Sequence, residues 1–173
     1  MSAPALQAST FEARIADDRW SEKLGDVDAL VATVLQHAAS AMSEQGGVEI
    51  LFTSDAEMRE LNRQWRDLDK PTDVLSFPSE GPGEPGQSEP LGDIALGFET
   101  ALHDAEAMGR PFEAHVSHLV IHGFLHLLGY DHIEAEDAKI MEPLESRILA
   151  GLGWPDPYST GPYAANDSDE GKS

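Results

Sequence analysis

The chain has 173 residues, of which 40 % are hydrophobic, so it is long enough to bury one sizeable core and is typical of a globular protein. It has no cysteine, which excludes thiolate metal sites, and no apolar run near the ~20 residues that cross a bilayer, so we expect a cytoplasmic protein without membrane contacts. Eleven Lys and Arg against 32 Asp and Glu give a net charge of −21, which argues against a surface that binds polyanions generally.

Hydrophobic periodicity predicts alternating strands and helices in the first part of the chain. The predicted elements are a strand within 5–15, a helix over 27–42, a strand over 48–53 and a helix over 54–65. Ser54 and Glu57 have the spacing of a capping box, which marks the start of the last of these helices. We expect Met58, Leu61 and Trp65 to form its buried stripe.

The rest of the chain continues this alternation. The predicted elements are strands over 73–77 and 91–97 and helices over 99–108, 111–128 and 134–152. Gly129 is expected to end the second of these helices, and Pro143 to kink or divide the third. We therefore expect one domain over 1–154, a flexible Pro- and Gly-rich loop at 78–90 and a disordered acidic tail at 155–173.

Three of the seven histidines lie in the stretch HGFLHLLGYDH, which begins at His122. His122 and His126 are four residues apart, so on a helix both rings can hold one ion from the same side. Gly129 can take the left-handed conformation that lets His132 approach the same point. Three imidazoles with one open position are typical of catalytic zinc. His118 continues the helix face but lies too far along it to share the ion, so we expect it beside the site.

The residue after His122 is Gly123, where H-E-x-x-H peptidases carry their general base, so a peptidase of that type is disfavoured. A metal site could still act on a phosphodiester if a cation neutralised the developing charge, and arginine suits that task. Four basic residues have the spacing of one helix face: Arg59, Arg63, Arg66 and Lys70. A solvated face that pairs with neighbouring acidic residues is the alternative interpretation.

Three separated motifs resemble the family of the bacterial endoribonuclease YbeY, an rRNA maturation factor. The motifs are HLVIHGFLHLLGYDH at 118–132, LNRQWRDLDKPTDVLSFP at 61–78 and LGDIALG at 91–97. The resemblance implies a zincin-like α/β (α+β) fold with a small mixed sheet of about four strands and about five surrounding helices. It also implies one Zn²⁺ per chain, bound by His122, His126 and His132 in a metal-dependent hydrolase domain.

The resemblance further implies a single-strand-specific endoribonuclease that acts in 16S rRNA 3′-end maturation and 70S ribosome quality control. The implied partners are single-stranded rRNA, the small ribosomal subunit with a ribosomal protein near its platform, and a ribosome-assembly GTPase, with no role for DNA. The arginine of the family falls on Arg66, which implies phosphate contact or transition-state stabilisation. His118 is a candidate catalytic residue, with Asp131 and Asp93 as alternative general acids. The candidate RNA contacts are Arg59, Arg63 and Lys70.

Two other functional classes remain as alternatives. One is a ribosome-assembly binding module with a structural zinc, and the other, disfavoured by Gly123, is a metallopeptidase. For an endoribonuclease, attack by water and attack by the ribose 2′-OH are both compatible with the sequence. The net charge of −21 predicts weak binding to free RNA, so we expect the ribosome or a protein partner to supply much of the localisation.

Overall fold

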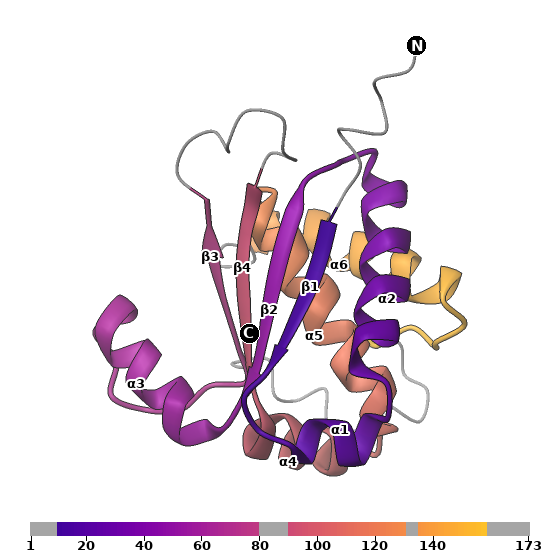
Figure 1. The fold of residues 1–173 in the computed structure, drawn as a ribbon. Helices are drawn as coiled ribbons and strands as arrows, with labels where there is room; N and C mark the ends of the chain where they lie inside the picture. The colour runs from indigo at the N-terminus through magenta and orange to yellow at the C-terminus, as the bar shows by residue number, and fades with distance from the viewer. Residues whose placement is uncertain (1–9, 80–89, 131–134, 159–173) are drawn as a thin grey trace.

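A computed structural model describes residues 10–79, 90–130 and 135–158 and has a four-stranded sheet at its centre (Figure 1). The strands are β1 Thr10–Ile15, β2 Gly47–Thr53, β3 Val74–Pro78 and β4 Pro90–Gly97. They lie in the order β1-β2-β4-β3, with β1, β2 and β4 parallel and β3 antiparallel to β4 at one edge. This mixed sheet and its helices confirm the predicted α/β class.

Six helices surround the sheet in the described part of the chain. They are α1 Arg19–Leu24, α2 Val27–Met42, α3 Asp55–Arg66, α4 Phe98–Met108, α5 Phe112–Leu127 and α6 Ala135–Gly151. The short α1 was not predicted, because six residues are too few to show a helical period. None of the described helices has both the length and the apolar character needed to span a membrane.

The interior of α6 contains Pro143, yet the helix runs without a break from Ala135 to Gly151. Of the two predicted effects of Pro143, a kink or a division of the helix, the division is therefore wrong. Proline removes one helical hydrogen bond, but Met141 and Ile148 on either side are fully buried and hold both halves against the core.

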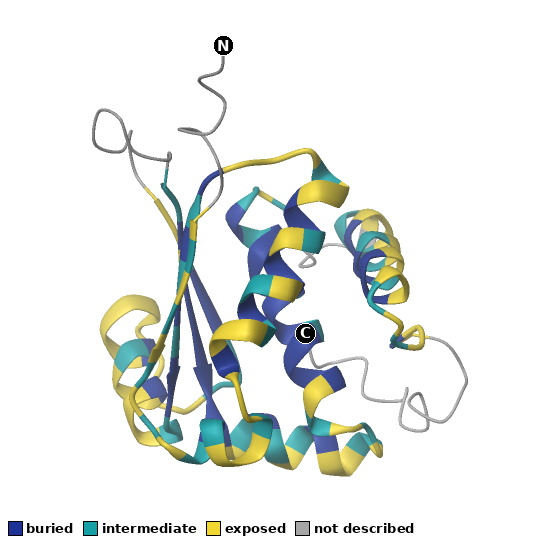
Figure 2. Ribbon diagram, turned by 45° about the vertical axis from the view of Figure 1, so that its right-hand side comes forward, coloured by how far each residue is buried: buried dark blue, intermediate teal, exposed yellow. Residues whose placement is uncertain are grey.

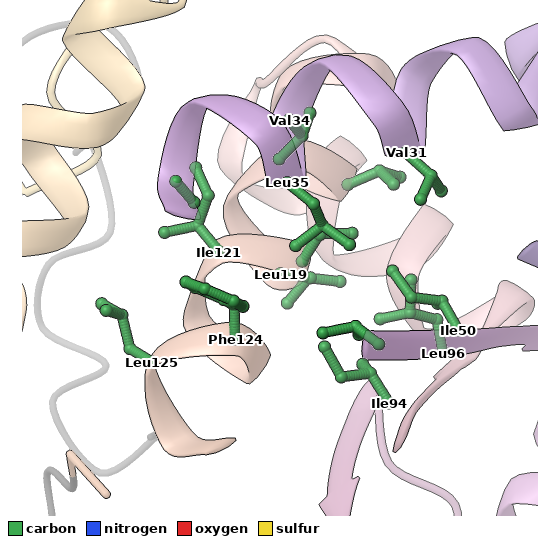
Figure 3. Close-up of a cluster of buried hydrophobic side chains, with 14 of the residues drawn as sticks. Val31, Val34, Leu35, Ile50, Ile94, Leu96, Leu119, Ile121, Phe124 and Leu125 are labelled. Atoms are coloured by element: carbon green, nitrogen blue, oxygen red, sulfur yellow. The ribbon is translucent and has the colours of Figure 1, made fainter. Parts of the chain in front are cut away.

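The main core lies between one face of the sheet and the helices α2 and α5. Figure 3 shows Val31 and Leu35 of α2 above Ile50, Ile94 and Leu96 of the sheet. The same core cluster includes four side chains of α5 that Figure 3 labels: Leu119, Ile121, Phe124 and Leu125. Most of α5 is consequently buried, as Figure 2 shows, and only a narrow strip of it reaches the surface.

The opposite face of the sheet packs against α3 through a smaller cluster of Met58, Leu75 and Ala95. Trp65, which was predicted to belong to this buried side, is instead 66 % exposed, so that prediction is wrong. Helical spacing identifies one face of a helix but not how much of that face meets a sheet. Here α3 lies beside the edge of a narrow sheet, and its last turn extends beyond the core (Figure 1).

The predicted loop at 78–90 is shorter at both ends than expected, because Pro78 ends β3 and Pro90 begins β4. The backbone N–H of Ser79 also donates to the carbonyl of Leu91 at 3.0 Å, which extends the pairing of the two strands. Residues 80–89 lie outside the described part of the chain.

Gly92 in β4 allows a close approach of the neighbouring edge strand. Its φ is +144°, and an added Cβ would lie 2.9 Å from the Cα of Pro78 and also clash with the carbonyl of Phe77. Gly109, at the end of α4, also has a positive φ of +68°, but an added Cβ there would meet nothing within 4 Å.

We expect Gly92→Ala to lower the free energy of unfolding by about 3 kcal/mol or more, because backbone strain and a steric clash add together. Gly109→Ala is the matched control and should cost about 1 kcal/mol, from backbone strain alone. Urea denaturation of both variants measures the difference. Equal losses would show that the contact between Gly92 and β3 is not tight.

Gly123 sets the distance between α5 and the sheet. An added Cβ at this position would lie 3.1 Å from the Cγ2 of Ile94 and 3.1 Å from the Oγ of Ser76. The Ser76 hydroxyl also donates to the Gly123 carbonyl at 3.1 Å. Position 123 therefore faces the packed interior. The glycine has a structural reason, the close packing of α5 on the sheet, in addition to the absence of a peptidase general base that the sequence indicates.

We expect Gly123→Glu to lower the free energy of unfolding by about 3 kcal/mol or more, because it places a carboxylate in the packed contact between α5 and the sheet. Ala150→Glu, at an exposed position in α6, is the control and should change stability by less than about 0.5 kcal/mol. Thermal and urea unfolding measure both variants, and a Gly123→Glu protein as stable as its control would contradict this account of the packing.

Candidate metal centre

His122 and His126 occupy the strip of α5 that is not buried by the core. Their side chains come from successive turns of the helix, and their Nε2 atoms face one another 3.1 Å apart. The ring centroids are 4.6 Å apart. The structure therefore brings together two of the three predicted metal ligands.

The hydrogen bonds of these rings determine which nitrogen carries the proton. The Nδ1 of His122 lies 2.5 Å from the Glu145 carboxylate, and the Nδ1 of His126 lies 2.9 Å from the Tyr130 carbonyl. Both partners accept only, so both Nδ1 atoms donate. In the neutral rings each Nε2 then directs a lone pair toward the other, and this pairing is repulsive unless a proton or cation lies between them.

This donor pair fits a zinc ion. Zn–N bonds of about 2.0–2.1 Å at a tetrahedral centre place two nitrogens about 3.3–3.4 Å apart, close to the 3.1 Å found between His122 and His126. A carboxylate or carbonyl that holds the second ring nitrogen is also the usual environment of a zinc-binding histidine.

The predicted third ligand, His132, and the candidate acid Asp131 lie outside the described residues, so their roles stay predictions. The end of α5, just before these residues, agrees with the prediction that Gly129 ends the helix. α5 ends at Leu127, Gly129 has a φ of +104°, and the N–H of Tyr130 donates back to the carbonyl of Leu125 at 3.0 Å.

Glu145 of α6 lies beside the histidine pair, and it was not predicted from the sequence as a site residue. It has no exposed surface, and its carboxylate accepts from His118 at 2.8 Å, from His122 and from the Tyr158 hydroxyl. Burial alone would raise the pKa of Glu145, but the bonds from His118 and His122 outweigh it and hold the pKa well below its usual range. A signal existed in the sequence, because Glu145 shares the helical spacing of the buried Met141 and Ile148.

His118 lies beside the pair, as expected, with both ring nitrogens in hydrogen bonds. Its Nδ1 accepts from Arg110 at 2.9 Å, since a guanidinium can only donate, and its Nε2 donates to Glu145. Burial lowers the pKa of His118 below its ordinary value despite the bond to Glu145. A neutral ring held at both nitrogens favours a supporting role over proton transfer.

The residues after α6 contact this hydrogen-bond network. Arg110 donates to the carbonyl of Pro157 at 3.2 Å, and the Tyr158 hydroxyl donates to Glu145. Burial and the charge of Glu145 raise the pKa of Tyr158, so the phenol stays a donor. The predicted start of a disordered tail at residue 155 is therefore too early, while 159–173 lie outside the described residues.

Arg66, at the end of α3, lies across the edge strand from the histidines. Its Nη2 donates to the Ser76 carbonyl at 2.6 Å, and its guanidinium lies 5.6 Å from the Phe77 ring centroid. The Ser76 hydroxyl in turn contacts Gly123, the neighbour of His122. Ser76 of β3 thus connects the predicted phosphate-binding arginine to the helix that carries the histidine pair.

The other members of the basic series have different surroundings. Arg59 pairs with Asp69 at 2.7 Å and Arg63 pairs with Glu60, all with exposed side chains. Lys70 is exposed but follows the end of α3, so it does not continue the helix face as predicted. The paired solvated face therefore describes Arg59 and Arg63, and their suggested RNA contacts stay predictions.

Asp93, the remaining candidate acid, is exposed on the sheet face opposite α5. Its register partners Glu49 and Phe77 lie on that same face, whereas Ile94 points to the core under α5. Burial and the charge of Glu49 raise the pKa of Asp93. The sheet thus separates this carboxylate from the histidine pair.

A second group of potential metal ligands consists of Asp73, Asp104 and His115, whose ligand atoms lie within 4.8 Å of one another. Burial and the charge of Asp104 raise the pKa of Asp73. Arg110 donates to the Nδ1 of His115 at 3.3 Å, so the proton of a neutral His115 is on Nε2. In this arrangement Arg110 occupies the Nδ1 of His115 and the Nε2 carries a proton, so neither ring nitrogen has a lone pair directed at a cation.

The sequence comparisons with known proteins all indicate the same family. The profile described as Endoribonuclease YbeY matches residues 14–153. A Bradyrhizobium sp. strain BTAi1 protein named Endoribonuclease YbeY is 44 % identical over 162 residues, covering 90 % of this chain and 96 % of its own. A protein of the same name from Cereibacter sphaeroides is 43 % identical over 164 residues, covering 85 % and 97 %.

The fold has a counterpart among solved structures. The solution structure of TM1509 from Thermotoga maritima is 24 % identical, covers 88 % of this chain and 98 % of its own, and superposes with a TM-score of 0.56. The profile match across most of the chain and the identity to full-length relatives show that this chain belongs to the endoribonuclease YbeY family.

Proposed function

We propose that the chain is a zinc-dependent endoribonuclease specific for single-stranded RNA, acting in the cytoplasm in 16S rRNA 3′-end maturation and 70S ribosome quality control. The observation that carries the proposal is the pair of Nε2 atoms of His122 and His126, 3.1 Å apart, with both Nδ1 atoms held by acceptors. The family of the chain supports cleavage of RNA as the reaction.

The residues that would hold one zinc per chain are His122, His126 and, as the predicted third ligand, His132. Zinc bound there would supply Lewis acidity at a phosphoryl oxygen and lower the pKa of water. The protein would contribute the fixed orientation of the rings through Glu145 and Tyr130. His118, held by Arg110 and Glu145, would support this arrangement.

Arg66 would contact the phosphate on the other side of β3. Its only described hydrogen bond is to a carbonyl, so the phosphate would not have to displace an acidic partner. Trp65, 66 % exposed beside it, offers an aromatic face on which an unpaired base can stack, which favours single strands.

The partners proposed for this reaction are the small ribosomal subunit, a ribosomal protein near its platform and a ribosome-assembly GTPase. The net charge of −21 supports a need for such partners, because long-range attraction to free RNA is weak or absent. The pairing of Arg59 with Asp69 and of Arg63 with Glu60 reduces the local positive charge further.

We expect purified protein to contain about one zinc per chain and His126→Ala to lose it, together with cleavage of a single-stranded RNA oligonucleotide. Metal analysis and gel assays measure the two properties in parallel, with a duplex of the same sequence as the substrate control. A His126→Ala protein that keeps both zinc and activity would refute the proposed centre. Zinc-dependent cleavage of casein would instead favour a peptidase.

We expect Arg66→Ala to keep its zinc and to lower kcat/KM for RNA by roughly 100-fold or more, because it removes charge stabilisation at the phosphate. Arg66→Lys should recover only part of the loss, since lysine lacks the planar fork. Arg147→Ala, at an exposed position in α6, is the control and should stay within about threefold of wild type.

Full activity in Arg66→Ala would contradict the phosphate role. If zinc-loaded wild type cuts no RNA but still binds the small subunit, the binding-module alternative replaces the enzyme. The product ends decide the chemistry, because a 2′,3′-cyclic phosphate shows attack by the 2′-OH and a linear phosphate without a cyclic precursor shows attack by water.

A further inference from the structure

We infer that Glu145 is a positioning residue for the metal centre, fixing His122 in the one tautomer whose Nε2 can bind a metal ion. The inference rests on the metal site of the proposed function. The spacing of the histidines does not identify this glutamate.

Both oxygens of the Glu145 carboxylate accept hydrogen bonds. It is 0 % exposed and accepts from three residues in two parts of the chain: His118 and His122 of α5, and Tyr158 after α6. A buried carboxylate without partners costs several kcal/mol, and the three donors that converge on Glu145 offset this cost.

Arg110 determines which atom donates and which accepts in each hydrogen bond of this cluster. Arg110 can only donate, so the Nδ1 of His118 accepts at 2.9 Å and its Nε2 must carry the proton that Glu145 receives. The second carboxylate oxygen receives the proton of the His122 Nδ1. The Nε2 of His122 is thereby directed at the Nε2 of His126, 3.1 Å away.

An amide of the same shape cannot replace the carboxylate. The amide has one oxygen that accepts and one nitrogen that donates, whereas Glu145 receives protons from both histidines. Arg110 prevents His118 from changing its tautomer, so the amide oxygen has to face His118. The amide nitrogen then faces His122, whose proton moves to Nε2, the atom that would bind the metal.

A purely structural role predicts a different result. The three hydrogen bonds also tie α5 to α6 and to the segment that contains Tyr158, so losing any of them lowers stability. If these hydrogen bonds served only to hold the segments together, the tautomer of His122 would be the same with an acid or an amide at residue 145.

The experiment compares wild type, Glu145→Gln and Tyr158→Phe as full-length proteins. Imidazole ¹H–¹⁵N correlation spectra of the metal-free proteins, with His122→Gln for assignment, report the tautomer of His122. Competition titration with zinc and a chelator reports affinity. Glu113→Gln, an exposed position on α5, is the matched control for the loss of one carboxylate.

We expect an Nδ1–H His122 in wild type, Tyr158→Phe and Glu113→Gln, and an Nε2–H His122 in Glu145→Gln. Zinc affinity should fall roughly 10- to 100-fold in Glu145→Gln. It should change by less than about threefold in Tyr158→Phe, which keeps both carboxylate–histidine bonds and removes only one structural tie.

Three outcomes overturn the inference. The first is an Nε2–H His122 in metal-free wild type, a result that does not depend on whether any variant folds. The second is an unchanged zinc affinity in Glu145→Gln, and the third is an equal loss in Tyr158→Phe, which would show a general structural effect. If wild type itself binds no zinc, the metal site of the proposed function fails too, so the two failures can be distinguished.

Discussion

The candidate site depends on the contact of α5 with the sheet at Gly123. The lack of a side chain there lets the helix backbone approach Ile94 and Ser76, and the Ser76 hydroxyl bonds the Gly123 carbonyl. Because this contact fixes the rotation of α5, His122 and His126 lie on its uncovered strip. The same Ser76 accepts from Arg66 on its outer side, so one strand residue sets the separation of the histidines and the arginine.

The second constraint is electrostatic. The core around α5 contains a fully buried carboxylate, Glu145, which lies on the same side of α6 as the buried apolar side chains of Met141 and Ile148. The free-energy cost of this burial is offset by charge-assisted bonds from two histidines and a tyrosine. The result is a rigid polar cluster that orients His122 through one ring nitrogen and leaves the other directed at His126.

The distribution of charge also shapes the function. A net charge of −21 gives the molecule a field that repels nucleic acid, and two of its arginines are engaged with acidic neighbours on α3 and the following loop. Arg66 differs from these two, because its guanidinium is held by a carbonyl and the ring of Phe77. Positive charge is therefore presented at one short-range position beside the proposed centre, which suits a substrate delivered by a larger assembly.

Local patterns in the sequence were sufficient for most of the secondary structure. The stripe over 27–42 predicted α2 with the bounds that the structure shows, and Ser54 caps α3 by accepting from the N–H of Glu57 at 3.3 Å. The spacing of His122 and His126 predicted two rings on one helix face, because a helix places residues four apart on the same side. Gly129 likewise predicted the end of α5 through its left-handed conformation.

Other features depend on contacts between segments distant in the sequence. The exposure of Trp65 follows from where α3 crosses the sheet edge, and the unbroken course of α6 through Pro143 follows from burial on both sides. Glu145 is 23 residues from His122, and no local pattern specifies that they meet. The sequence by itself determined which helix carries the histidines, since helical periodicity is local. Only the tertiary structure decided which buried acid orients them, because burial and hydrogen-bond partners arise when the segments pack.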